Sequence, residues 1–201
     1  MFYKKIFINY IHLLTPSFLL KFLIFFWGLF FKSHKSFSQK GEDLIVLSYF
    51  KGINITRGVY LDIGCFHPKW ISNTHLLHKS GWTGYAVDID KYKLNAMKYV
   101  RGKAVKCIHG AVTPNVNDNG NIKVFKFKRV WSDFDTLDKD YADQIKDKYK
   151  IYYNEEMINS IYINNLFSKL PHINFLNLDI EGLDKEVILN LDLEKYKPDV
   201  I

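Results

Sequence analysis

From residue 38 onward, short apolar segments alternate with segments in which apolar residues recur at helical spacing. The apolar segments 58–64, 84–87, 104–108 and 173–178 predict strands. One helix is predicted to begin after Ser38 as its N-cap, and a second over residues 72–79. Two more are predicted, one after Asp88 and one after Asp179. This alternation predicts an α/β fold with a doubly wound, Rossmann-like parallel sheet. The apolar residues at helical spacing are Leu44, Leu47, Phe50, Leu94, Met97, Val100, Leu183, Val187, Ile188 and Leu191.

The middle of the chain has a weaker pattern. Residues 113–122 are rich in Asn, Gly and Pro and predict a loop. Residues 122–130 alternate apolar and basic side chains, which predicts a half-exposed strand, and 158–163 predict another strand. A solvated helix is expected after Asp138.

The first 37 residues form a separate basic and aromatic segment, ahead of a main domain over 38–201. Residues 1–41 hold six Lys and no acid, so they supply most of the net charge of +7, and a basic face for nucleic acid on the main domain is disfavoured. The apolar run 18–31 is shorter than the roughly 20 residues of a spanning helix. We expect a hydrophobic helix in peripheral contact with the inner face of the membrane of a cytoplasmic protein; a true span, or packing on the domain or a partner, stays open.

The two cysteines, Cys65 and Cys107, are too few for a disulfide framework, and their number is typical of a reducing compartment. Cys65 and His67, with His75 and His78 spaced three apart, can be imagined as zinc ligands. A helical histidine pair without a second spaced pair is a weak signal, so no metal is assigned.

Acidic residues stand at the ends of three predicted strands: Asp62, Asp88 and Asp179, with Glu181 two residues further on. Ligands of doubly wound sheets bind beyond these strand ends. The turn after Asp62 lacks the G-x-G-x-x-G of dinucleotide sites, and an acid there repels pyrophosphate but suits a cation. Asp88 follows Asp62 by 26 residues and is placed to bind a ribose. These features favour S-adenosylmethionine; acids in the surface loops of a structural domain are the alternative.

Six segments carry a resemblance to a known family. In order they are SQKGED (38–43), VYLDIGCFHP (59–68), SNT (72–74), GWTGYAVDID (81–90), FDTLD (134–138) and INFLNLDIEG (173–182). The series resembles the FkbM-type methyltransferases, class I S-adenosylmethionine-dependent enzymes often found with polysaccharide or secondary-metabolite genes. The resemblance covers roughly residues 38–201 and implies O-methylation of a hydroxyl acceptor, a sugar of a polysaccharide or glycoconjugate.

The resemblance also implies roles for individual residues. Asp62 and Gly64 would form the cofactor turn, Asp88 would hold the ribose, and Asp179 and Glu181 would face the methionine end and the acceptor pocket. The candidate bases are Asp179, Glu181 and His67. Asp179 is expected to be a positioning acid rather than a proton acceptor, because a strand-end carboxylate near a sulfonium would keep a low pKa. The full cofactor-binding set is Asp62, Gly64, Cys65, Asn73, Asp88, Ile89, Ala111, Val112 and Asp179.

Two departures from the family pattern affect these expectations. Phe66, His67 and Pro68 stand where many relatives have a longer glycine turn. Val200 and Ile201 are expected to begin a strand beside the one that ends at Asp179, so the domain resembles one truncated before its last strands. An open sheet edge of this kind is expected to favour oligomers. A non-catalytic scaffold therefore remains the alternative function, and a dinucleotide or nucleotide-sugar enzyme is a third possibility that Asp62 disfavours.

Overall fold

The computed structural model describes residues 36–116, 120–128 and 131–201, and its centre is a parallel four-stranded sheet. The strands are β1 (Val59–Ile63), β2 (Thr83–Asp88), β3 (Val105–His109) and β7 (Phe175–Leu178), in the order β3-β2-β1-β7. All three strand pairs are parallel. The predicted doubly wound, Rossmann-like sheet is therefore confirmed. Val200 forms the expected parallel bridge with Phe175 at the β7 edge.

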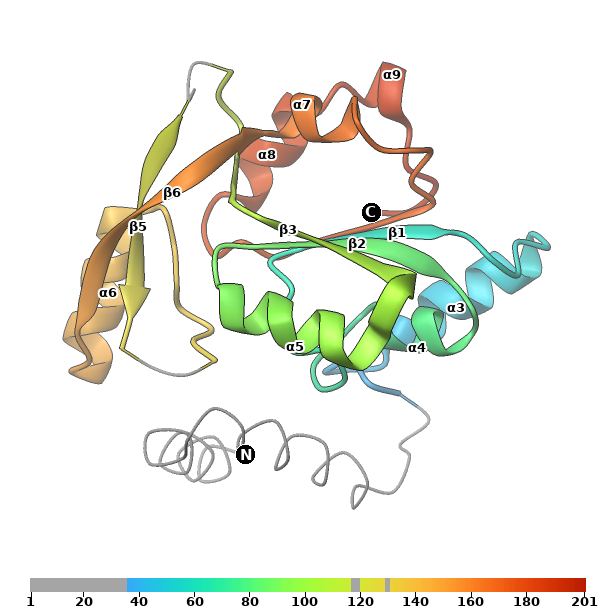
Figure 1. The fold of residues 1–201 in the computed structure, drawn as a ribbon, viewed down its shortest axis with the longest axis horizontal. Coiled ribbons are helices and arrows are strands. Elements are labelled where there is room, and N and C mark those ends of the chain that lie inside the picture. The colour runs from blue at the N-terminus through green and yellow to red at the C-terminus, as the bar shows by residue number, and fades with distance from the viewer. Residues whose placement is uncertain (1–35, 117–119, 129–130) are drawn as a thin grey trace.

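Helices cover both faces of this sheet (Figure 1). One layer holds α3 (Glu42–Gly52), α4 (His75–Lys79) and α5 (Lys91–Arg101), followed by a short 3₁₀ turn over Gly102–Ala104. The other layer holds α7 (Ile163–Phe167), α8 (Asp184–Asn190) and α9 (Leu193–Tyr196). Because the crossover helices lie on both faces, the strands are buried between two apolar cores.

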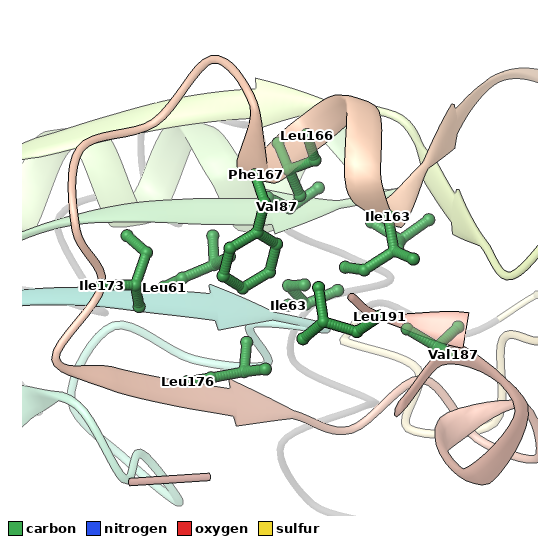
Figure 2. Packing of buried hydrophobic residues seen from close by; sticks show 11 residues of the cluster. Leu61, Ile63, Val87, Ile163, Leu166, Phe167, Ile173, Leu176, Val187 and Leu191 are labelled. Carbon is green, nitrogen blue, oxygen red and sulfur yellow. The ribbon is translucent and has the colours of Figure 1, made fainter. Parts of the chain in front are cut away.

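The alternation of side chains along each strand sends residues into both cores. Leu61, Ile63 and Val87 pack against α7 and α8, as Figure 2 shows with Phe167 and Leu191 among their neighbours. Tyr60 packs on the opposite face, in a cluster with Phe50, Leu77, Trp82 and Phe175. A third cluster lies between α5 and strands β2 and β3 and consists of Cys65, Ala86, Leu94, Met97 and Val105.

A second, smaller sheet lies beside the main one. Its strands are β4 (Ala111–Thr113), β6 (Tyr153–Tyr162) and β5 (Asn121–Phe127), in the order β4-β6-β5, and α6 (Lys139–Tyr149) packs on it. β6 pairs parallel with β4 and antiparallel with β5. The predicted strands over 122–130 and 158–163 thus exist with shifted bounds, and they belong to this separate sheet.

Two predicted helix starts are wrong. Gly41, with a φ of 94°, caps α3 in place of Ser38, whose hydroxyl accepts hydrogen bonds from the N–H groups of Gly41 and Asp43. α4 begins at His75 instead of Ser72, and the Ser72 N–H donates to the carbonyl of Phe37 at 3.0 Å.

The predicted hydrophobic helix over 18–31 lies outside the described residues. Within the described ranges, every helix is too short or too polar to span a bilayer.

Candidate functional site

A cavity of about 330 Å³ opens at the carboxyl ends of β1, β2 and β7. The strand ends supply one wall, and a loop over residues 132–137 that belongs to the second sheet supplies the facing wall. Gln39 and Glu42 line it from the N-terminal end of α3. The cavity therefore lies where doubly wound sheets bind ligands.

The turn after β1 requires glycine at position 64. Gly64 has a φ of 78°, and a Cβ there would overlap the carbonyl oxygen of Asp179. The Gly64 N–H donates to the Val87 carbonyl at 2.9 Å, and the Asp179 N–H donates to the Ile63 carbonyl at 3.0 Å. This close approach brings the ends of β1, β2 and β7 together around one point.

The buried Asp62 carboxylate is held from two sides. The Thr74 hydroxyl donates to one oxygen at 2.5 Å, and the Asn177 amide donates to the other at 2.9 Å. Asn177 in turn accepts from the Asn73 amide at 2.8 Å. Both carboxylate oxygens are thus oriented by protein donors.

Arg101 holds the groups around Asp62 in place through a set of buried hydrogen bonds. Its guanidinium is buried and donates to the hydroxyls of Thr74 and Ser72, both at 2.8 Å, to the Tyr60 hydroxyl at 3.0 Å, and to the Pro68 carbonyl at 3.0 and 3.2 Å. A planar guanidinium carries enough N–H donors to bind several acceptors at once. Arg101 therefore connects the end of α5 to the loop that carries Asn73 and Thr74.

Asp88 ends β2 beside a buried lysine. One Asp88 carboxylate oxygen accepts from the Asp90 N–H at 2.7 Å. Burial raises the pKa of Asp88 to about 6, against the opposing effect of the Lys93 ammonium. Burial alone would lower the pKa of Lys93, but the carboxylates of Asp88, Asp135 and Asp90 outweigh burial and raise it. Lys93 also donates to the Ser132 carbonyl at 2.7 Å, which ties the 132–137 loop to the Asp88 side of the cavity.

Asp179 and Glu181 lie at the other end of the cavity. Partial burial and the carboxylates of Asp184 and Asp62 raise the pKa of Asp179. The low pKa expected for Asp179 beside a sulfonium stays a prediction. Burial also raises the pKa of Glu181, and the hydrogen bond from the Tyr141 hydroxyl, 2.9 Å long, opposes this shift. Two carboxyls that hold protons more readily than usual therefore face the same cavity.

Glu181 stands in a strained backbone position. Its φ is 51°, and its carbonyl accepts from the Thr136 hydroxyl at 2.7 Å. The conformation is held by the 132–137 loop, by Tyr141 of α6 and by the following Gly182, whose φ is 106°. Non-glycine residues in this region cluster at functional sites.

His67 lines the cavity, but its ring is engaged by its own loop. The Nδ1 atom accepts hydrogen bonds from the N–H groups of Lys69 at 3.1 Å and Trp70 at 2.9 Å. In the neutral ring the proton is therefore on Nε2, which can only donate. We accordingly do not assign His67 as a base.

Aromatic rings surround this part of the cavity wall. The His67 ring lies 4.8 Å from that of Trp131, and the Phe66 ring lies 6.2 Å from Trp131 and 6.4 Å from Trp70. Trp70 is 40% exposed. The cluster provides apolar ring surface next to a cavity otherwise rich in carboxylates.

Most of the predicted site residues line this one cavity. They are Asp62, Gly64, His67, Asn73, Asp88, Ile89, Ala111, Val112, Asp179 and Glu181. Cys65 is the exception, because its side chain is buried in the core under α5, where burial raises the pKa of the thiol well above its usual value. In the described part of the chain, no three or more His, Cys, Asp or Glu side chains gather in a way that could hold a metal ion.

Sequence reasoning missed several residues of the site. Asn177 and the 132–137 loop lie within or beside segments quoted for the family resemblance, so those segments were the available signal. Lys93 carried no signal of its own. It precedes Leu94 in α5, and only the fold turns its ammonium toward Asp88.

Comparison with known proteins adds little to this geometry. No protein-family model matches the chain, and no curated protein matches it. Among solved structures, the chain is similar to a Methanococcus maripaludis protein described as a candidate S-adenosyl-L-methionine-dependent methyltransferase, with 18% sequence identity and a TM-score of 0.27. The match covers 45% of this chain and 49% of that chain, so this chain spans about half of that protein's length. A likeness this distant establishes no activity.

Proposed function

We propose that this protein is an S-adenosylmethionine-dependent methyltransferase. The observation that carries the proposal is the meeting of Asp62, Asp88 and Asp179, from three strand ends, in one cavity around the Gly64 turn. Asp88 supplies the carboxylate for a ribose at the end of the second strand. Asp62 and Asp179 supply negative charge where a cationic group would lie.

The same charges disfavour the competing ligands of this fold. A dinucleotide or nucleotide sugar places its pyrophosphate at the turn after the first strand, which in those proteins offers several glycines and a helix N-terminus. Here the turn has one glycine, and Asp62 and Asp179 stand beside it. A diphosphate at this place would be repelled by both carboxylates.

For the acceptor we propose a hydroxyl group, of a sugar in a polysaccharide or glycoconjugate. The aromatic rings of Phe66, Trp70 and Trp131 offer faces against which the apolar side of a sugar ring packs. When bound, S-adenosylmethionine would supply a methyl group made electrophilic by its sulfonium. Glu181 would accept the proton of the attacking hydroxyl at its carboxylate, because the burial that raises its pKa favours proton uptake.

Tyr141 would be a positioning residue for this step. Its hydroxyl donates to the Glu181 carboxylate, which holds one oxygen and leaves the other to face the acceptor. The 132–137 loop keeps the Glu181 backbone in its strained conformation through the Thr136 hydroxyl. In this proposal, contacts from the second sheet and α6 orient the base, and the strand ends of the first sheet carry the cofactor side.

Equilibrium binding and methyl transfer test the proposal together. The full chain should bind S-adenosylhomocysteine at micromolar level and show no binding of NAD or a UDP-sugar in calorimetry. Glu181→Gln should keep that affinity but lose methyl transfer to a panel of sugar acceptors by about 100-fold or more. Glu186→Gln, an exposed position on α8, is the matched control and should behave as the parent. Binding of NAD or a UDP-sugar in place of S-adenosylhomocysteine would refute the proposal.

A further inference from the structure

The layer of α3, α4 and α5 has an unusual distribution of charge. Within residues 36–116, all of which the structure describes, the exposed charged side chains are all basic. Glu42 is half-buried and lines the cavity, and the Asp43 carboxylate is fully buried and accepts hydrogen bonds from Ser36, Phe37, Ser38 and Leu44. The exposed basic residues of this layer are Lys40, Lys51, Arg57, Lys79, Lys91, Lys98 and Lys103. Lys106 is also exposed, but it is on β3 and lies over the Tyr85 ring on the opposite face of the sheet.

Large apolar side chains accompany these bases on the outward sides of two helices. On α3 the inward Phe50 is fully buried, whereas Ile45 is 71% and Tyr49 48% exposed, one helical turn apart. On α5 the inward Met97 is buried, whereas Tyr92 is 75% and Tyr99 62% exposed. Both helices turn their buried sides to the same face of the sheet (Figure 1), so these exposed residues point away from it on the same side of the molecule.

The opposite layer provides an internal comparison. Over residues 163–201, which are also all described, α7, α8 and α9 with their connections expose acids as well as bases. Leu189 is 72% and Leu193 42% exposed there, so exposed apolar residues alone do not distinguish the two layers. The distinguishing feature is that every exposed charged side chain within residues 36–116 is basic. The exposed charges of the second layer are Lys169, Lys185, Lys195, Lys197, Glu186, Asp192, Glu194 and Asp199, and Asp179 is exposed at the cavity.

The chain enters the described structure on the same basic layer. The Phe37 carbonyl accepts from the Ser72 N–H at 3.0 Å, the Phe37 ring packs edge-on against His75 of α4 at 4.5 Å, and the Lys79 ammonium lies 5.2 Å from the centre of that ring. The preceding residues 1–35 contain the apolar run 18–31, five Lys and no acid. That segment therefore joins the domain at the layer with the matching composition.

We propose that the outward face of α3, α4 and α5, which we call the basic face, docks on an anionic lipid bilayer beside the N-terminal segment. Basic side chains gain attraction from anionic headgroups, and exposed aliphatic and aromatic side chains insert at the interface. A nucleic acid or an acidic polysaccharide would match the lysines but leave Ile45 and Ile53 without an apolar environment. This inference does not rest on methyl transfer, since lipid binding is measured without any cofactor.

The test is flotation of the full chain with vesicles of neutral lipid alone and of neutral lipid with about a third anionic lipid. In the test variant, Ile45→Asn, Tyr99→Asn, Lys51→Gln and Lys98→Gln remove two apolar groups and two charges from the basic face. All four positions are exposed, so the fold should be kept, as a cooperative thermal transition would verify. The loss of two lysines and two apolar contacts predicts a fall in binding to anionic vesicles of about 20-fold or more.

The matched control makes the same replacements on the opposite layer: Leu189→Asn, Leu193→Asn, Lys185→Gln and Lys195→Gln. This variant should bind anionic vesicles within about twofold of the parent, because the same number of charges and apolar groups has been removed from a face that does not touch lipid. Parental binding by the test variant would overturn the proposal. So would an equal fall in both variants, equal binding of the parent to neutral vesicles, or displacement of the parent from vesicles by RNA at the same salt concentration.

Discussion

Replacement of Asp88 by Asn is the sharpest test of the proposed ribose-binding role of this residue. Asn keeps the size of the side chain and an oxygen that can accept from the Asp90 N–H, but it removes the negative charge. A hydrogen bond to a charged group contributes about 1.5–3 kcal/mol. At pH 7.5 we therefore expect the affinity of Asp88→Asn for S-adenosylhomocysteine to fall about 10- to 100-fold.

The pH dependence gives this prediction a second, independent part. With a pKa of about 6, Asp88 is almost fully ionised at pH 7.5, but only about a tenth of it is ionised at pH 5. Protonation removes the charged acceptor, so the parent should bind S-adenosylhomocysteine about tenfold more weakly at pH 5 than at pH 7.5. Asp88→Asn has no charge to lose, and its affinity should change little over that range.

Calorimetric titration at the two pH values measures both parts. Asp147→Asn, an exposed position on α6, controls for the loss of one negative charge from the protein and should bind as the parent does. Equal affinity of the Asp88→Asn variant and the parent at pH 7.5 would remove Asp88 from the site. A deficit of the same size at both pH values would show that the raised pKa plays no part.

Three further predictions concern the frame of the site. Gly64→Ala should lower the free energy of unfolding in urea by more than about 3 kcal/mol, because the new Cβ overlaps the Asp179 carbonyl. Gly102→Ala is also at a positive φ but in open space, so it should cost less, about 1–3 kcal/mol. Equal losses would contradict the overlap. Arg101→Met should lower the free energy of unfolding by about 1–3 kcal/mol for each buried acceptor that is left without a partner. An unchanged melting temperature would show that these hydrogen bonds contribute nothing. Between pH 5 and 7.5, affinity for S-adenosylmethionine should rise more steeply than affinity for S-adenosylhomocysteine. The raised pKa of Asp179 moves its ionisation toward this range, and only S-adenosylmethionine carries a sulfonium that the carboxylate can attract. Parallel curves for the two ligands would show that Asp179 does not lie beside the sulfonium.

The parallel sheet and most of the cavity lining could be predicted from the sequence for a simple physical reason. Strands β1, β2 and β7 are short apolar segments that each end in an acid, and a parallel sheet brings all of their carboxyl ends to one edge. Asp62, Asp88 and Asp179 therefore converge through topology alone. Cys65 stands next to this edge in the chain, but the turn sends its side chain under α5. The position of Cys65 in the sequence does not show in which direction its side chain points.

The second sheet was harder to foresee. β6 carries exposed polar residues over much of its length, since one side of the small sheet faces solvent, and it therefore lacks the apolar run that marks a buried strand. The burial of Lys93 could not be predicted for a related reason. A lysine in an amphipathic helix is ordinarily expected in solvent, and its burial depends on carboxylates that come from β2 and from the 132–137 loop.

The two halves of the cavity wall belong to different sheets, and this division has an evolutionary consequence. Bonds within the second sheet hold the 132–137 loop, where Thr136 bridges to Phe125 and the Asp135 carboxylate accepts from the Phe127 N–H. Mutations in that unit would reshape the side proposed for the acceptor while the Gly64 turn and Asp62 stay as they are. Related proteins with this architecture would therefore be able to evolve new acceptor specificities while the proposed donor site stays unchanged.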